Sequence, residues 1–449
     1  MTTRKKIWLG GACALVLSVA LFSENPAIGN APESVTAVTG KRLVAAGEDL
    51  RNESFGARRI VRIGDTSYIG YSQLTQGEWR ILVKSLNHKT GALGDPVDIC
   101  PGTDDHSVMS LVADAKGRLH CVSGGHGALK YVRTERPGDM NSWTSPEQIG
   151  MGTYPMLMVD RDDGLFLFYR AYKQTDLAMQ VRPADGEWSK PAIIGRTSGP
   201  VFYIMGTAMG NEKGRQSLHV AGHFYGSPAE YGKPWPEEAY GYRIIPWYIC
   251  SRDGGRTWEK AGGETIGLPV DEKSVDILFD SDEPYDIPWS VDIALDADNR
   301  PRVFCAFSAR RPAPGMGLRA VQNEIGKLPS RLTEFSWDGR RWIKAGIETP
   351  GLKGTHFSHP TAVFSDGTFH VAAAFSRLET TRPKSEDPTG GLLHLWRRNS
   401  GPWQEELLDE NCAYANWKLP DRSGELEIMW RGKSPDGESA IYYRRLSGK

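Results

Sequence analysis

The feature that most constrains the fold of this chain is a motif that recurs seven times: a turn with Asp and Gly, followed by a strand of alternating apolar residues. The residues that mark the seven turns are Gly64, Gly117, Gly164, Gly214, Asn299, Gly367 and Gly424. They are separated by 53, 47, 50, 85, 68 and 57 residues. A four-stranded propeller blade repeats at roughly 40–50 residues, so the longer intervals leave room for loop insertions. One such unit cannot bury both of its faces alone, so neighbouring units must stack.

We therefore predict an all-β protein, a seven-bladed β-propeller that forms a single domain. The chain starts in the middle of the pattern, so we expect the first and last blades to share strands and close the ring. Gly accounts for 50 of the 449 residues, above its usual share of ~7%, which fits many tight turns. No long Ala/Glu/Lys/Leu stretch is present, which argues against a helical bundle.

The N-terminus is typical of an export signal. A basic segment, Arg4 to Lys6, is followed by an apolar run from Ile7 to Phe22, short for a membrane span. We expect residues 1–31 to be a signal peptide cleaved near Ala27 or Ala31, and residues 32–449 to form the propeller. The alternative is an uncleaved anchor. The expected location is secreted or periplasmic, with no membrane contact beyond the signal segment.

Charge and cysteine content exclude two classes of protein. The chain has 54 basic and 55 acidic residues, a net charge of -1, and no block of like charge, so no basic face for nucleic acid is expected. Five scattered cysteines remain after Cys13, an odd number, so the chain is not a disulfide scaffold. We expect most of them to be buried in strands, and we expect a monomer.

The segment Ser251 to Trp258 fits the pattern S-x-D-x-G-x-T-W, known as the Asp-box. Its Ser and Asp side chains can bond to the backbone of the turn, its glycines permit unusual dihedral angles, and its Trp packs between strands. We therefore interpret Asp253 as structural rather than catalytic. A weaker relative of the motif runs from Ser336 to Trp342.

Candidate chemistry gathers around two neighbouring units. His106 follows two aspartates before the second strand unit, and His126 lies in a Gly-Gly-His-Gly segment after it. Tyr154 and Arg170 bracket the inner hairpin of the next unit, so all four side chains are expected at one end of the ring. We interpret the glycines as allowing close approach of a ligand. The structural alternatives are a strand-end ion pair for Arg170 and a packed ring for Tyr154.

These segments resemble the BNR-repeat proteins that include the propeller ulvan lyases. The resemblance rests on Asp104-Asp105-His106, His126, Tyr154-Pro155, Phe168-Tyr169-Arg170, the Asp-box, and Arg58 to Val61 before Tyr68 to Tyr71. It implies that His106, His126, Tyr154 and Arg170 are the catalytic set. Ser107 stands where the family usually has Asn after Asp-Asp-His.

The resemblance also implies a polysaccharide lyase that acts by β-elimination on an anionic glycan containing uronate, similar to ulvan. Arg170 would pair with the carboxylate, His106 or Tyr154 would remove the C5 proton, and the other group or His126 would protonate the leaving oxygen. Asp105, Tyr225 and Trp235 are candidate substrate contacts; the last two come from an aromatic insertion that alternatively forms a packed surface loop.

A metal site is a further expectation, and no organic cofactor is expected. The resemblance implies a structural zinc ion held by His and Cys side chains. His219, His223 and Cys250 are the candidate ligands, although they do not complete a set of four. His356 and His359 form a second candidate pair.

Two other functions compete with the lyase. A sialidase-like hydrolase needs a cluster of arginines, for which Arg58, Arg59 and Arg170 are available, but the Arg-Ile-Pro segment typical of sialidases is absent. Other hydrolases need two carboxylates across the bond, whereas Asp104 and Asp105 are adjacent and point apart on a strand. A non-catalytic carbohydrate-binding propeller would need the aromatic loops but not the His, Tyr and Arg set.

Overall fold

The structure is a computed structural model, and most of the chain beyond its N-terminal segment is described. The described ranges are 41–44, 50–51, 57–171, 175–197, 201–212, 215–226, 243–279, 287–308, 329–352, 355–377, 390–398, 400–410, 412–417, 425–433 and 439–446. The predicted signal segment, residues 1–31, and its boundary with the propeller lie outside these ranges. The described residues form thirty β-strands and one 3-10 helix, η1 (Pro350–Leu352), which confirms the all-β prediction.

The strands form antiparallel sheets whose members follow one another along the chain. The first two sheets are β1 (Lys41–Val44), β30 (Ser439–Leu446), β29 (Leu426–Lys433) and β28 (Cys412–Trp417); and β2 (Leu50–Arg51), β3 (Ile60–Ile63), β4 (Thr66–Thr75), β5 (Glu78–Asn87) and β6 (Val97–Pro101). The third is β7 (Val108–Ala113), β8 (Leu119–Gly124), β9 (Gly127–Arg133), β10 (Glu147–Val159), β11 (Leu165–Ala171), β12 (Asp176–Arg182) and β13 (Ala192–Arg196).

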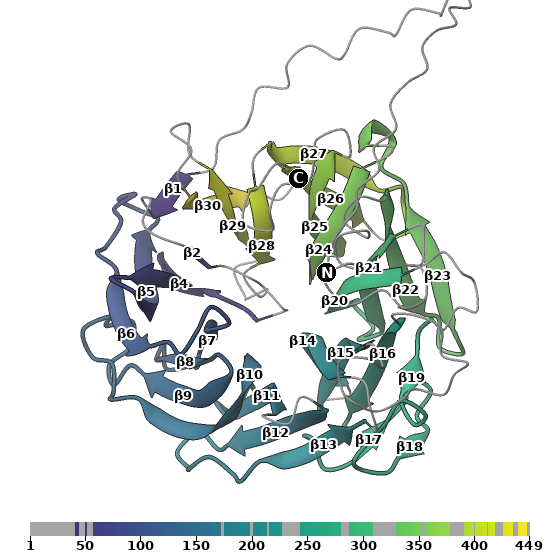
Figure 1. The fold of residues 1–449 in the computed structure, drawn as a ribbon, viewed down its shortest axis with the longest axis horizontal. Helices are drawn as coiled ribbons and strands as arrows, with labels where there is room; N and C mark the ends of the chain where they lie inside the picture. Colours follow the sequence, from purple (N-terminus) through teal and green to yellow (C-terminus); the bar gives the residue numbers. More distant parts are fainter. Residues whose placement is uncertain are drawn as a thin grey trace, which may run out of the picture. The chain divides into compact units, whose positions relative to one another are not determined.

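The remaining three sheets complete the ring. They are β14 (Val201–Glu212), β15 (Arg215–Gly226), β16 (Arg243–Ser251), β17 (Trp258–Glu259), β18 (Thr265–Ile266) and β19 (Asp276–Ile277); β20 (Ile287–Leu295), β21 (Pro301–Ser308), β22 (Ser330–Trp337) and β23 (Trp342–Ile347); and β24 (Thr355–Ser365), β25 (Thr368–Arg377), β26 (Gly390–Arg398) and β27 (Gln404–Asp409). Figure 1 shows these sheets arranged around a central axis, with β7, β10, β14, β20, β24 and β28 nearest to it. This is a β-propeller, as predicted.

The predicted count of seven blades needs correction. Each of the seven marked turns does join or precede an antiparallel strand pair, but the described strands make six hydrogen-bonded sheets. The reason is the long strand β10: residues 147–152 pair with β9, and residues 156–159 pair with β11. Two strand units are thereby joined into one seven-stranded sheet, which turn spacing alone did not reveal.

The ring closes as expected, because β1 near the N-terminus pairs with β30 at the C-terminal end. The inner strands are buried on both faces, since a neighbouring sheet packs against each; β7, for example, is buried at five of its six positions. The outer strand β23 instead alternates between partly buried and exposed positions. This gradient follows from stacking sheets face to face around an axis.

A bulge recurs in the inner strands. The register shifts between Thr153 and Met156 in β10, and equivalent shifts occur in β14, β20, β24 and β28. Three of these bulges contain a residue with positive φ other than glycine: Tyr154 (57°), Ser290 (56°) and His359 (49°). A bulge bends a strand and redirects the side chain at that point.

The Asp-box is structural, as predicted. The Asp253 carboxylate accepts hydrogen bonds from the backbone N–H groups of Arg256 (3.0 Å) and Thr257 (2.9 Å), and Ser251 Oγ accepts one from Gly255 N (2.8 Å). Trp258 is 1% exposed, in the core. The cysteine prediction also holds where it can be checked: Cys100, Cys121, Cys250 and Cys305 are buried, and none of these four forms a disulfide. The side chain of Cys412 lies outside the described residues.

Buried polar groups connect the sheets at the centre of the ring. Arg58 Nη2 lies 3.4 Å from Asp292 Oδ2, and Arg58 also donates to Thr361 Oγ1 (3.3 Å) and to the Ala362 carbonyl (3.2 Å). Through these contacts, Arg58 and Asp292 link three separate sheets or their connections.

Within the described ranges, no helix has the length and apolar character that crossing a membrane requires.

Candidate functional site

The four predicted side chains come from adjoining parts of the seven-stranded sheet. His106 lies in the connection between β6 and β7, and His126 lies in the tight link between β8 and β9. Tyr154 sits in the bulge of β10, and Arg170 is the last but one residue of β11, opposite Thr153. Antiparallel strands alternate in direction, so these connections and strand ends all meet at the same end of the ring.

The structure brings the four side chains together. The rings of His106 and His126 are 4.1 Å apart between centroids, and His106 is 6.2 Å from the Tyr154 ring. The guanidinium carbon of Arg170 is 4.8 Å from the centre of the Tyr154 ring, and Arg170 Nη2 is 3.2 Å from His126 Nε2. The cluster therefore contains two imidazoles, a phenol and a cation within mutual reach.

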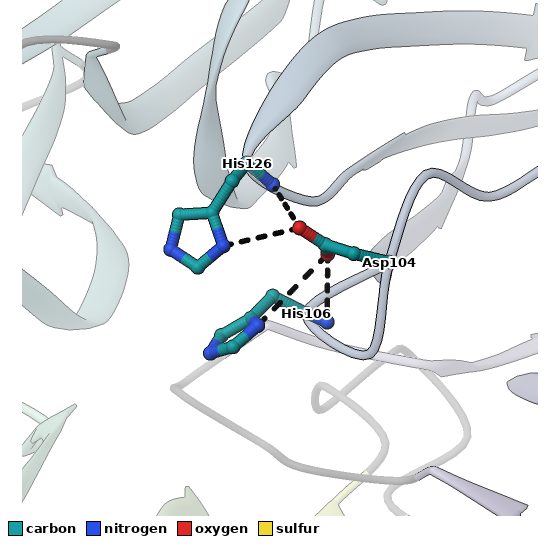
Figure 2. Close-up of side chains that lie close together, drawn as sticks. All are labelled: Asp104, His106 and His126. Atoms are coloured by element: carbon teal, nitrogen blue, oxygen red, sulfur yellow. Dashed lines mark hydrogen bonds and ion pairs between the residues drawn. The ribbon is translucent and has the colours of Figure 1, made fainter.

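Asp104 holds both histidines in place (Figure 2). Its Oδ1 accepts the backbone N–H of His106 (2.8 Å), and its Oδ2 accepts both the backbone N–H (3.0 Å) and Nδ1 (3.1 Å) of His126. Burial raises the pKa of Asp104, but these hydrogen bonds outweigh it and lower the pKa below the usual range. Asp104 is thus a carboxylate that positions the two histidines. The sequence analysis did not predict this role for Asp104.

Two of the glycines around His126 make room for neighbouring side chains, Gly125 for Asp104 and Gly124 for Leu129. A Cβ atom on Gly125 would collide with Asp104 Oδ1 and Thr103 Oγ1, and one on Gly124 would collide with the Leu129 side chain. Glycine is therefore needed here because the carboxylate approaches the backbone closely.

The partners of His126 define its protonation state. Asp104 Oδ2 only accepts, so Nδ1 carries the proton, and Arg170 only donates, so Nε2 carries a lone pair. Partial burial lowers the pKa of His126, and the charges of His106 and Arg170 lower it further, against the opposing effect of Asp104. His126 is a neutral ring whose two nitrogens are both engaged.

His106 is arranged differently. Its Nδ1 is 2.7 Å from Asp105 Oδ1, so this nitrogen donates and Nε2 is left as a hydrogen-bond acceptor. Asp105, predicted as a substrate contact, is 52% exposed and orients His106 in this structure. Of the two imidazoles, His106 is the one whose outer nitrogen can accept a proton.

Arg170 is a buried cation held by aromatic rings. It is 2% exposed, and its guanidinium carbon is 4.8 Å from the Tyr154 ring and 4.7 Å from the Tyr203 ring. Its Nε donates to Thr153 Oγ1 (2.9 Å). No ion pair of Arg170 with a carboxylate is found within the described ranges, so the structural alternative of a strand-end ion pair is not observed there.

Sequence reasoning missed Tyr203 and Thr153. Tyr203 lies in β14, 5.7 Å from the Tyr154 ring and 5.3 Å from the His223 ring, with which it stacks. Tyr154 lies in the bulge of its inner strand, and Tyr203 lies next to the bulge of the following one. Aligning the repeat units at the bulges of their inner strands would have indicated Tyr203 as a candidate beside Tyr154.

The three candidate zinc ligands are not brought together. His219 Nε2 is 2.8 Å from Ser217 Oγ and its Nδ1 is 2.6 Å from Tyr248 Oη, so both nitrogens are engaged by hydroxyl groups. His223, four positions along β15, instead stacks on Tyr203. Cys250 is buried opposite His219. As placed here, these side chains do not fit a shared zinc ion.

Within the described ranges, one group of three side chains has potential metal-ligand atoms within 4.8 Å of one another: Asp104, His106 and His126. The oxygens of Asp104 already accept three N–H groups, so this group is organised by hydrogen bonds. His356 and His359 both lie on β24, and burial, together with His356, lowers the pKa of His359 to about 4. Trp235 and the side chain of Tyr225 lie outside the described residues.

The fold and the cluster together define a β-propeller with a polar site at one end of the ring. Residues 64–313 match the sequence model of the family described as BNR repeat-containing family member, and the chain belongs to this family. This confirms the family resemblance seen in the sequence.

Three known proteins are similar to the chain. An ulvan lyase of Nonlabens ulvanivorans is 21% identical over 357 residues, covering 68% of this chain and 68% of that protein. An ulvan lyase of Alteromonas sp. (strain LOR) is 20% identical over 296 residues, covering 56% of this chain and 54% of that protein, about half its length. The solved structure of a PL25 ulvan lyase bound to -[GlcA(1-4)Rha3S]- has a TM-score of 0.64 at 15% identity and covers 92% of this chain and 97% of that one. At this identity the structural likeness establishes the fold.

Proposed function

We propose that the chain is a polysaccharide lyase that cleaves an anionic, uronate-containing glycan by β-elimination. The observation that carries the proposal is the buried Arg170 beside two imidazoles and a phenol. The names of the two similar curated proteins, both ulvan lyases, support this reaction and a glycan similar to ulvan. The N-terminal segment supports a secreted or periplasmic protein.

Each side chain has a defined task in this reaction. Arg170 binds the uronate carboxylate and disperses the charge that builds up when the C5–H bond breaks. His126 accepts a hydrogen bond from Arg170 and so orients the guanidinium; it is a positioning residue. The base and acid functions fall to His106, through its Nε2 lone pair, and to Tyr154.

The atoms balance as follows. The base takes the C5 proton, and the C5–H electron pair forms the C4=C5 double bond. The C4–O bond then breaks, and the leaving glycosidic oxygen takes a proton from the acid. The product is an unsaturated uronate at the new non-reducing end and a free hydroxyl on the other fragment, with no oxidant or water consumed.

The competing hydrolase has less support. Arg58, a candidate for a sialidase-type arginine cluster, pairs with Asp292 and bonds to the backbone at the centre of the ring. Asp104 accepts three N–H groups and Asp105 bonds to His106, so neither carboxylate stands ready across a glycosidic bond.

The test is the ultraviolet absorbance of unsaturated uronate during incubation with a panel of uronate glycans, ulvan first. We expect His106→Gln and Tyr154→Phe each to lower kcat/KM by about 10²–10⁴-fold, as loss of a general acid or base does. Arg170→Met should lower it by about 10²–10³-fold. Tyr131→Phe is the matched control, because it removes a buried hydroxyl that bonds to His120 outside the cluster.

Two results would contradict the proposal. The first is an absence of absorbance on every glycan while binding persists, which would make the protein a carbohydrate-binding propeller. The second is product formation without absorbance but with new reducing ends, which would make it a hydrolase.

A further inference from the structure

A pocket lies at the opposite end of the strands from the candidate active site. It has a volume of about 520 Å³, within the range of small-ligand sites. Its lining comes from the sheet β24–β27 and from β29 and β30. It includes Ser365, Asp366 and Thr368, where the first strand of a sheet turns into the second, whereas His106 precedes a first strand and His126 follows a second. Strand direction therefore places the two sites at opposite ends.

The pocket carries an excess of positive charge. Three arginines line it, against the carboxylates of Asp366 and Glu406. Arg445 is paired with Glu425, outside the lining, and Arg444 Nη2 lies 3.8 Å from Glu406 Oε2. Arg444 Nη1 is buried and has no hydrogen-bond partner among the described residues. The Arg444 side chain lines the pocket, is 20% exposed and lies 3.8 Å from Glu406, so its guanidinium can donate charged hydrogen bonds to an anionic ligand.

A chain of two histidines lies in the same pocket. Glu406 Oε1 is 3.0 Å from His394 Nδ1, and His394 Nε2 is 3.1 Å from His370 Nδ1. The carboxylate accepts the Nδ1 proton of His394, so His394 Nε2 accepts from His370 Nδ1. His370 is thereby left with an acceptor lone pair on Nε2. Burial, and to a lesser extent His394, lowers the pKa of His370 to about 3, so it stays neutral.

Trp396 supplies an apolar surface to the pocket. It is a partly buried lining residue beside the His394 ring, with centroids 5.1 Å apart. The lining thus combines guanidinium donors for a carboxylate, a neutral imidazole acceptor for a hydroxyl, and an indole face for the C–H face of a sugar ring.

We propose that this pocket is a second carbohydrate site, which binds one uronate unit of an acidic oligosaccharide. Arg444 and the exposed Arg398 bind the carboxylate, His370 Nε2 accepts a hydroxyl proton, and Trp396 stacks on the ring. None of the residues of the candidate catalytic cluster lines the pocket, so the proposal does not depend on the lyase activity.

The test is fluorine NMR on the full-length protein labelled with 5-fluorotryptophan. The chain has fourteen tryptophans, and the resonance that disappears in Trp396→Phe is assigned to the one in the pocket. The probe is sodium glucuronate, with glucose and sodium sulfate as comparison probes. We expect a saturable shift of the Trp396 resonance with glucuronate, and none with glucose.

Arg444→Met should weaken the binding of glucuronate by about tenfold or more, the scale of one lost charged hydrogen bond. Arg398→Met, at an exposed position, should weaken it without a risk to folding. Arg256→Met, an exposed arginine in the Asp-box turn, is the matched control and should leave the titration unchanged.

Three results would overturn the proposal: no shift of the Trp396 resonance, a titration unchanged in both pocket variants, or a response to sulfate equal to that to glucuronate. The last would make the pocket a site for a bare anion. Failure of the lyase assay would leave this titration unaffected, so the two proposals fail separately.

Discussion

The positioning role of Asp104 gives the sharpest prediction for the candidate active site. Asp104→Asn keeps the size of the side chain but replaces one carboxylate oxygen with an NH2 group. That carboxylate now accepts three N–H groups, two from His126 and one from His106. In either orientation of the new amide, its NH2 group faces one or two of these N–H donors and cannot accept a hydrogen bond from them.

The magnitude follows from the bonds lost. The better orientation keeps the amide oxygen on His126 and leaves the His106 N–H without its acceptor, which costs about 1–3 kcal/mol. Asp104 is 32% exposed, so water replaces part of the lost bond and the lower part of that range applies. We expect kcat/KM to fall by about 10–30-fold, at 1.4 kcal/mol for each factor of ten.

The assay is the absorbance of unsaturated uronate, measured as a function of pH. Asp104 raises the pKa of His126, so the variant should also move the acid limb of kcat/KM to lower pH. Asp160→Asn is the matched control, because Asp160 Oδ1 accepts the N–H groups of Asp162 (2.8 Å) and Gly164 (2.6 Å) in a turn away from the site. Activity of Asp104→Asn within threefold of the parent, or an acid limb that moves to higher pH, would refute the reasoning.

Three other predictions follow from the same structure. Gly125→Ala should reproduce the loss in activity of the Asp104 variant, because its Cβ would displace that carboxylate; a fully active Gly125→Ala protein would contradict this. Asp253→Ala should lower the free energy of unfolding by about 1–3 kcal/mol, from the lost turn bonds, and leave kcat/KM unchanged; denaturant titration and the lyase assay measure the two. Burial lowers the pKa values of His219 and His223 to about 3, so the unfolded chain binds their protons first and stability is lost as pH falls below about 6.5. Between pH 7 and pH 5 each histidine should lower the free energy of unfolding by roughly 2 kcal/mol. In denaturant titrations, His219→Gln should therefore make the free energy of unfolding depend less steeply on pH; an unchanged pH dependence would contradict this prediction.

The fold could be predicted because the repeated turns can be recognised in the sequence. Turns of similar composition precede the second strand of each unit, so the antiparallel strand pairs could be located from the sequence. The number of sheets was not, because it depends on how β10 continues from β9 to β11. That continuity is a property of backbone pairing between strands, and no residue type marks it.

The site was predictable in its charged and ring members but not in their supports. His106, His126, Tyr154 and Arg170 stand out because they flank strand pairs of neighbouring units. Thr153, the partner of Arg170 Nε, is an ordinary strand residue that gains a role only through the register of β10 and β11. The zinc candidates failed to converge for a related reason: His219 turned out to be satisfied by two hydroxyl groups that its own spacing could not reveal.

The surroundings of Arg170 explain why the bulge in β10 matters. Burying a guanidinium is unfavourable unless it is compensated, and within the described ranges the compensation comes from two aromatic rings and a neutral imidazole instead of a carboxylate. One of those rings, Tyr154, reaches the cation from a backbone with φ of +57°, a conformation that costs an aromatic residue free energy. A strand without the bulge would point that ring elsewhere. The distortion therefore keeps a desolvated positive charge in place without neutralising it, which is the condition for binding an anionic substrate group strongly.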